Sequence, residues 1–243
     1  MRKDGRALDA LRAVKIIPDF TENPLASVLI ELGKTRVFCA VTSESTVPRF
    51  LRGTEKGWVT AEYALLPSAT HTRVTRESSQ GKVSGRTSEI QRLIGRSMRA
   101  VVDLSQLGER TLWVDCDVLQ ADGGTRTASI TGAYIALELA LRRLVKRGEL
   151  DVFPILDSVA AISVGVVDGE VVLDLPYDED SCAAVDMNIV ATGKGRLVEV
   201  QGTGEGATFS AEQLIEMTNL ALKGIAELTQ RQREVLDAMV EKI

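Results

Sequence analysis

The chain has 243 residues, 44% of them hydrophobic and 26% charged, which is typical of a globular protein and excludes a disordered or fibrous one. It contains no run of about 18 apolar residues that could span a membrane, and no apolar segment follows its charged first residues as in a signal peptide, so we expect a cytoplasmic protein. The three cysteines are far apart and a single histidine accompanies them, so we expect each cysteine to pack as a small apolar residue rather than to form disulfides or a zinc site.

The net charge of −5 is distributed unevenly along the chain. Residues 49–99 contain eight arginines and two lysines against four glutamates, a local charge of +6, so the rest of the chain carries −11. A confined basic segment on an acidic protein is typical of a nucleic-acid enzyme with a narrow entry path, although solvated arginines explain the charge equally well. Because only 4% of the residues are aromatic, a base-stacking platform like that of an RNA-recognition motif is not expected.

Runs of apolar and β-branched residues predict eight strands, the first two of which form a hairpin. The strands are expected at residues 27–32, 35–43, 57–65, 112–119, 160–167, 171–175, 184–191 and 196–201. Apolar residues at spacings of three and four predict three helices. The helices are expected at residues 87–104, at residues 128–146 and from Ser210, which forms a capping box with Gln213.

This order of elements predicts an α/β fold of the α+β type, with mixed sheets and about three main helices. The glycine-rich motifs of nucleotide-binding folds are absent at the required positions. No shift in composition marks a linker, so we expect a single domain over residues 1–243. The longest polar stretch, residues 67–85, is expected to be a functional or mobile loop.

A candidate phosphate site lies where a predicted strand ends and a buried helix begins. Gly123 and Gly124 permit unusual backbone angles, and Thr125 and Arg126 follow directly. Free N–H groups at a helix N-terminus bind anions, and an arginine adds a forked, permanent positive charge. A tight turn capped by Thr127 or Ser129 accounts for the same residues equally well.

A second arginine stands at the start of the preceding helix. Arg86 could contact phosphate there, although Thr87 or Ser88 acting as a helix cap is a sufficient explanation of the sequence. Three further arginines at spacings of four and three form a basic stripe on this helix, which could follow an RNA backbone or face solvent or another subunit. They are Arg92, Arg96 and Arg99.

Carboxylates are crowded at the end of a predicted strand, in residues 174–180 and again at Asp186. Clustered acids have raised or coupled proton affinities, which suits a general acid, and their oxygens also suit Mg²⁺. An acidic surface loop is the simpler interpretation and is favoured when this segment is considered alone.

Five segments, taken together, resemble the bacterial ribonuclease PH family of phosphorolytic exoribonucleases. They are DGR at residues 4–6, GWVTAEYALLPSATHTR at 57–73, GRTSEIQRLIGRSMRA at 85–100, DCDVLQADGGTRTASITGAYIAL at 115–137 and EDSCAAVDMNIV at 179–190. Their order and spacing make the resemblance far more specific than any one segment. It implies a two-layer fold and a homo-hexamer built as a trimer of dimers.

The resemblance also implies roles for individual residues. The phosphate-binding positions of the family fall on Arg86, Gly124, Thr125 and Arg126. Its catalytic acids, which also suit a Mg²⁺ ion, fall on Asp180 and Asp186. Its RNA-contacting loop falls on Arg73 and Arg76, to which the stripe residue Arg99 is added as a further RNA contact. The chain departs from the family at Ser68, where many members carry a third arginine. The affinity for tRNA and the stability of the ring are therefore not implied by the resemblance as firmly as the activity is.

The activity implied is phosphorolytic trimming of the 3′ ends of tRNA precursors. Inorganic phosphate would be the co-substrate and nucleoside 5′-diphosphates the products, and the reverse reaction would add nucleotides. Neither DNA nor a membrane is an expected partner. Two alternatives are a catalytically silent, RNA-binding subunit of a ring and a hydrolytic, metal-dependent nuclease. The first would lack part of the arginine and aspartate sets, and the second would leave the phosphate-binding residues unexplained.

Overall fold

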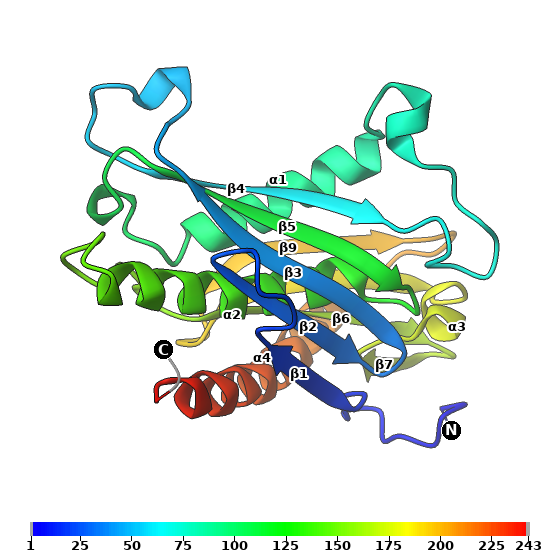
Figure 1. Cartoon of the computed structure of the whole chain (residues 1–243). Helices are drawn as coiled ribbons and strands as arrows, with labels where there is room; N and C mark the ends of the chain where they lie inside the picture. The colour runs from blue at the N-terminus through cyan, green and yellow to red at the C-terminus, as the bar shows by residue number, and fades with distance from the viewer. Residues whose placement is uncertain (1, 242–243) are drawn as a thin grey trace.

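The computed structural model describes residues 2–241, which form two β-sheets and four α-helices (Figure 1). The first sheet has the strand order β1-β2-β3-β5-β4 and is antiparallel except between β4 and β5. Its strands are β1 (Val14–Pro18), β2 (Ala26–Leu32), β3 (Thr35–Glu44), β4 (Trp58–Leu65) and β5 (Thr111–Gln120). A parallel pair needs a long crossover, and here α1 (Gly85–Arg99) supplies it.

The second sheet is antiparallel throughout and has the order β7-β6-β8-β9. Its strands are β6 (Val159–Val167), β7 (Glu170–Leu173), β8 (Val185–Thr192) and β9 (Leu197–Gly204). The remaining helices are α2 (Thr125–Lys146), the single turn α3 (Tyr177–Asp180) and α4 (Ala211–Met239). Three short 3-10 helices occur at Arg49–Leu51, Glu77–Gln80 and Leu104–Gln106.

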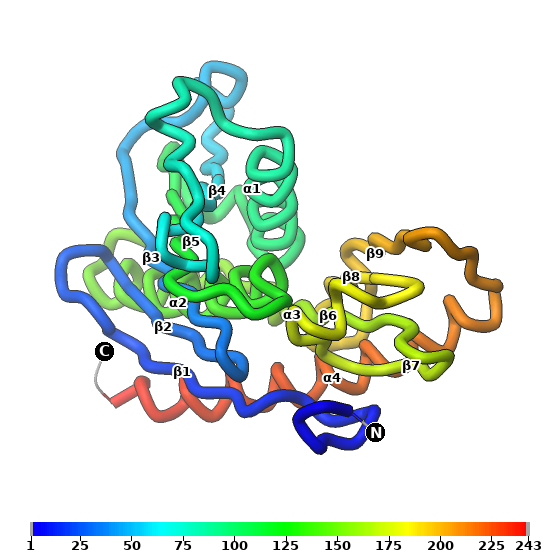
Figure 2. The backbone as a smooth tube through the Cα atoms, turned by 90° about the vertical axis from the view of Figure 1, so that its right-hand side faces the viewer, coloured from blue at the N-terminus to red at the C-terminus, as the bar shows by residue number. Residues whose placement is uncertain are grey.

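Helix α2 lies between the two sheets, where Figure 2 shows it at the centre of the molecule. Most residues of this helix are buried, and Ile130, Ile135 and Leu139 are completely so. Burial of so many apolar side chains stabilises the helix far more than its intrinsic propensity does. The N-terminus of α2 is therefore held in place by the core.

Strand β6 is buried on both faces. Ala161 and Val159 pack in the core that includes α2, whereas Ile162 and Val164 pack in a second core that includes Ile225 of α4. This explains why β6 is a continuous apolar run rather than an alternating one. The predicted mixed α/β class with about three main helices is confirmed, since three of the four described helices are long.

Several predicted boundaries were wrong. Helix α1 spans residues 85–99 rather than 87–104, because Val102 leaves the helix to form an isolated bridge with Ile155. Helix α2 begins three residues earlier than predicted, and the short, polar-flanked strand β1 was missed. Cys182 is exposed, whereas the other two cysteines are buried as expected. The capping box at Ser210 is confirmed.

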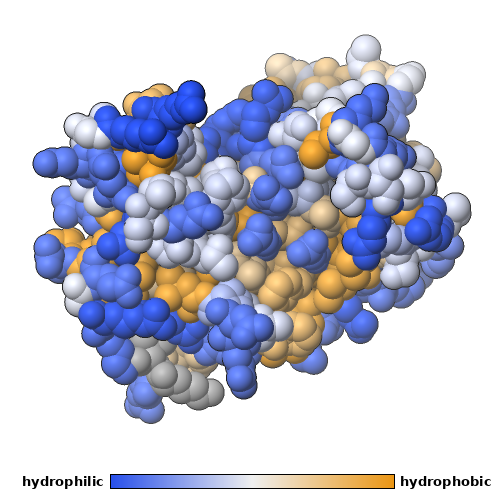
Figure 3. All heavy atoms as spheres, turned by 45° about the horizontal axis from the view of Figure 1, so that its top comes forward, coloured by the Kyte–Doolittle hydropathy of each residue, from blue (hydrophilic) through white to orange (hydrophobic). Residues whose placement is uncertain are grey.

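The surface combines hydrophilic residues with apolar ones. In the space-filling view, a band of apolar residues lies exposed across the middle of the face, between hydrophilic residues (Figure 3). No helix in the described part of the chain is long and apolar enough to cross a membrane.

Candidate active site at the start of helix α2

The loop before α2 has the backbone form that the glycine pair predicted. Gly123 and Gly124 have φ angles of 72° and 66°, in the left-handed region that favours glycine. Gly124 is the residue before the first turn of α2, and no side chain caps its N–H groups. Capping by Thr127 or Ser129 was wrong, because both hydroxyls donate to backbone carbonyls of Gly124 and Thr125, at 2.9 and 2.8 Å. The helix therefore presents uncapped N–H groups and the positive end of its dipole.

Gly123 allows this loop to pack closely against the backbone of residues 175–177, which belong to the acidic segment of residues 174–180. A Cβ atom at this position would lie 2.5 Å from the carbonyl oxygen of Leu175 and 2.8 Å from backbone atoms of Pro176 and Tyr177. Only a glycine allows two backbones to approach so closely. The approach holds α3, which begins at Tyr177 and ends at Asp180, beside the start of α2.

Asp180 and Asp186 share one electrostatic environment with Arg86 and Arg126. Burial, together with the charge of Asp180, raises the pKa of Asp186 to about 6, and the charges of Arg126 and Arg86 oppose this rise. Burial also raises the pKa of Asp180, again opposed by Arg86 and Arg126. One carboxylate oxygen of Asp186 is buried without a hydrogen-bond partner among the described residues. The structure thus brings together all four charged residues that the sequence assigned to phosphate and catalysis.

Arg126 is held by residues that the sequence analysis did not single out. Its guanidinium donates to Gln201 Oε1 at 2.8 Å and contacts Glu89 Oε1 at 3.4 Å, and Gln201 donates to Glu89 at 2.9 Å. Glu205 raises the pKa of both Asp180 and Asp186. Gln201 and Glu205 carry no recognisable motif, whereas Glu89 could have been noticed because it lies one helical turn after Arg86.

Arg86 is the second residue of α1 and its side chain is exposed. The cap of this helix is Ser84, whose hydroxyl accepts the N–H of Thr87 at 3.1 Å, so the assignment of Thr87 or Ser88 as the cap was wrong. Arg86 is consequently not needed to complete the helix start and can turn to a ligand. A further polar contact joins the hydroxyls of Tyr63 and Thr125 at 2.8 Å.

The three predicted RNA-binding arginines lie in two different places. Arg73 and Arg76 are exposed in the loop before α1, and Arg76 lines a cavity of about 330 Å³ together with Arg86. Arg99 lies at the other end of α1, about 20 Å from Arg86 along the helix axis. Its guanidinium donates to the carbonyl of Val59 at 2.8 Å and lies 4.3 Å from the ring centroid of Trp58. The structure does not bring Arg99 together with the other predicted site residues.

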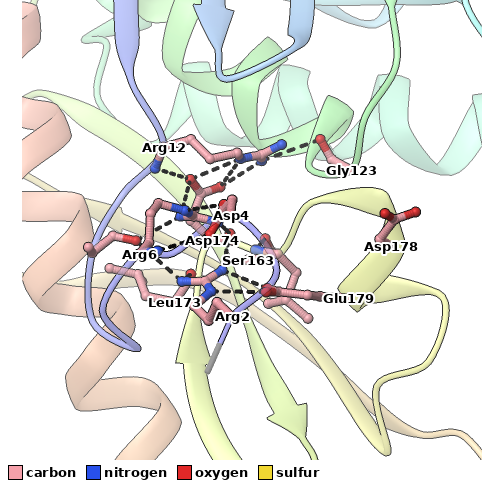
Figure 4. Close-up of polar contacts among 12 residues, drawn as sticks. Arg2, Asp4, Arg6, Arg12, Gly123, Ser163, Leu173, Asp174, Asp178 and Glu179 are labelled. Atoms are coloured by element: carbon pink, nitrogen blue, oxygen red, sulfur yellow. Dashed lines mark hydrogen bonds and ion pairs between the residues drawn. The ribbon is translucent and has the colours of Figure 1, made fainter.

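A buried network of ion pairs and hydrogen bonds holds the acidic segment, residues 174–180, in place (Figure 4). The carboxylate of Asp174 is fully buried and accepts hydrogen bonds from the guanidinium of Arg12, the shortest at 2.6 Å, with Arg6 at 3.5 Å. Arg2 forms a second buried ion pair with Glu179 at 2.6 Å. These arginines come from the N-terminal segment, so the first residues of the chain hold the loop that carries Asp180.

Substitution Asp174→Asn should lower the free energy of unfolding by about 3–5 kcal/mol, because it leaves buried arginine charges without their partner. Denaturation in urea measures the change. Asp9→Asn is the matched control, since Asp9 pairs with Lys223 on the surface with about half of each side chain exposed, and it should leave stability unchanged. Equal stabilities of the two variants would contradict the role given to this network.

Two family models match the chain. The model described as 3′ exoribonuclease family, domain 1, matches residues 10–142, and that described as domain 2 of the same family matches residues 157–224. Arg86 and Arg126 fall in the first match and Asp180 and Asp186 in the second, so the site takes residues from both.

Named relatives support the same assignment. The chain is 59% identical to the ribonuclease PH of Syntrophomonas wolfei, over 97% of this chain and 98% of that one. It is also 59% identical to the ribonuclease PH of Bacillus subtilis, over 97% of each chain. The chain belongs to the 3′ exoribonuclease family. It is a phosphorolytic 3′→5′ exoribonuclease.

Solved structures share the fold. A chain of the Archaeoglobus fulgidus exosome, solved with RNA bound to the active site, has a TM-score of 0.79 and 25% identity, over 95% of this chain and 92% of that one. Rice Rrp46 has a TM-score of 0.78 and 21% identity, over 97% of this chain and all of the other. At this low identity, the likeness to rice Rrp46 shows the fold alone.

Proposed function

We propose that this exoribonuclease trims the 3′ ends of tRNA precursors, using a phosphate ion bound by Arg86, Arg126, Thr125 and the N–H groups at Gly124. The observation that carries the proposal is the convergence of two arginines and two aspartates on the uncapped start of α2. The positive groups bind an anion, and the half-buried carboxyls supply a proton.

The chemistry follows from the charges. Phosphate is already an anion, so no strong base is needed, but two mutually repelling phosphate groups must be brought together. Arg126 and Arg86 offset this repulsion and the charge that builds on the reacting phosphorus. An oxygen of the free phosphate forms a bond to the phosphorus of the last RNA linkage, and the bond from that phosphorus to the 3′ oxygen breaks. Asp186 gives its proton to the departing 3′ oxygen, and a nucleoside 5′-diphosphate is released.

As an alternative to the proton transfer, Asp180 and Asp186 in their ionised forms fit a Mg²⁺ ion. Mg²⁺ usually binds one or two carboxylates together with substrate phosphate oxygens, and the unpartnered oxygen of Asp186 is available for it. No group of three or more histidines, cysteines or acids that could hold a metal occurs within residues 2–241, so the substrate would complete the coordination. Bound there, the ion would neutralise phosphate charge.

RNA would approach through the basic loop. Arg76 and Arg86 line one cavity beside Tyr63, so an RNA phosphate held by Arg76 would lie next to the reacting phosphate. Arg73 from the same loop would contact RNA farther from its end, and Arg99 would contact a more distant part of a tRNA. The RNA-bound archaeal relative supports this use of the fold.

The enzyme would act in the cytoplasm as a homo-hexamer, a trimer of dimers. Its similarity to exosome subunits and the exposed apolar band in Figure 3 support an assembly of this kind. Ser68 removes one positive charge that many relatives carry in the RNA loop, so the grip on tRNA would depend more on Arg73 and Arg76.

A tRNA precursor with 3′ extra nucleotides should be shortened only when inorganic phosphate is present, and the products should be nucleoside 5′-diphosphates. Incubation with and without phosphate, followed by chromatography of the nucleotides, measures both. Added diphosphates without phosphate should lengthen the RNA. Equal shortening in both tubes, or release of monophosphates, would favour the hydrolytic alternative, and RNA binding without any shortening would favour the silent subunit.

A further inference from the structure

The peptide bond between Gly123 and Gly124 is held from one side by a buried hydroxyl. Thr35, the first residue of β3, donates its hydroxyl to the carbonyl oxygen of Gly123 at 2.7 Å. The same hydroxyl accepts the N–H of Asp122 at 3.0 Å. Thr35 itself is completely buried.

Arg12 holds the same loop with its guanidinium. It donates to the carbonyl of Asp122 at 2.5 Å and contacts the carbonyl of Gly123 at 3.5 Å. Its remaining donors bind Asp174, the first residue of the acidic segment of residues 174–180. Arg12 is 6% exposed and each of its three guanidinium nitrogens has an acceptor within the protein, so we assign it as a support rather than as a phosphate ligand.

These contacts fix the direction of the neighbouring N–H. In a planar trans peptide the N–H points opposite to the C=O, so binding of the Gly123 carbonyl by Thr35 turns the Gly124 N–H away from Thr35. No described residue accepts a hydrogen bond from that N–H. Both glycines have positive φ angles, a region in which glycine has unusual freedom, so a support is needed to keep one orientation.

We propose that Thr35 and Arg12 are positioning residues that aim the Gly124 N–H at the reacting phosphate. Arg12 in addition couples this orientation to the segment of residues 174–180 through Asp174, so that the phosphate and Asp180 keep one relative placement. The inference rests on the proposed function, in which phosphate binds at Gly124.

Thr35→Val tests the inference, because valine keeps the size of threonine and removes both hydrogen bonds. In steady-state assays of the full-length enzyme, the KM for inorganic phosphate should rise about tenfold, as expected for losing one oriented donor, while the KM for RNA changes by less than about twofold. Thr35→Ser, which restores the hydroxyl, should return the phosphate KM towards that of the wild type. A merely structural role would lower kcat and the melting temperature without this selective change.

Arg12→Lys provides a second, independent measurement, since lysine keeps the charge but cannot bind Asp174 and the loop carbonyls together. It should also raise the KM for phosphate selectively. The inference is overturned if the phosphate KM of both variants equals that of the wild type, or if Thr35→Ser is as impaired as Thr35→Val. A wild-type enzyme that needs no phosphate would instead refute the proposed function, so the two failures are distinguishable.

Discussion

Arg126→Ala should lower kcat for phosphorolysis by a factor of about 10²–10³, the usual loss when one donor that stabilises developing charge is removed. The guanidinium of Arg126 is fixed by contacts with Gln201 and Glu89. Its alignment is therefore set before substrate binds. Single-turnover rates at saturating RNA and phosphate measure the effect.

Arg147→Ala is the matched control for this variant. Arg147 directly follows the same helix at its other end, about 30 Å away, and its side chain is 59% exposed. It should leave kcat unchanged. If the two variants were equally active, Arg126 could not be the phosphate ligand, and if Arg126→Ala lost its fold, circular dichroism would show it.

Asp186→Asn should have opposite effects on rate and stability. Removal of the proton donor should lower kcat by a factor of about 10²–10⁴, as is typical for general acids. The same change should make the protein more stable at pH 7, because a partly buried carboxylate with one unpartnered oxygen is replaced by a neutral group. Asp178→Asn, at an exposed acid of the neighbouring helix α3, should change neither quantity.

The gain in stability of Asp186→Asn over the wild type should appear at high pH and vanish at low pH. The pKa of Asp186 is raised from 3.8 to about 6 in the folded protein, so the folded state binds the proton more tightly than the unfolded state does. The contribution of Asp186 to the free energy of unfolding of the wild-type protein should therefore fall as the pH rises from about 4 to about 6. Asp186→Asn should be more stable than wild type above about pH 6 and equal to it below about pH 4. Melting curves in EDTA, which removes bound metal, test this, and a gain at low pH would contradict it.

The sequence predicted the local geometry at the start of α2, because Gly124 and Arg126 lie at the junction of a strand and a helix. The junction alone left phosphate binding and a simple tight turn equally open. The acids of α3 and β8, considered alone, favoured a surface loop, so the roles of both sets came from the family resemblance. Local patterns also gave most strands, because apolar runs bounded by turns identify them.

The supporting residues could not be predicted, because they act across long separations in sequence. Gln201 meets Arg126 from 75 residues away, and Arg12 reaches Asp122 across 110 residues. Which strands become neighbours depends on the packing of the whole core, and no local pattern reports it. The helix boundaries were wrong for the same reason, since Val102 belongs to the core but not to α1.

The burial of α2 between the two sheets has a consequence for how this enzyme can change over evolution. The helix that presents its N-terminus to phosphate is also the central part of the core, with Ile130 and Ile135 fully buried. In a close-packed core a volume change at either residue is expected to displace the helix, and catalysis is sensitive to displacements of about 1 Å. We therefore expect selection on these core residues to act on activity as well as on stability.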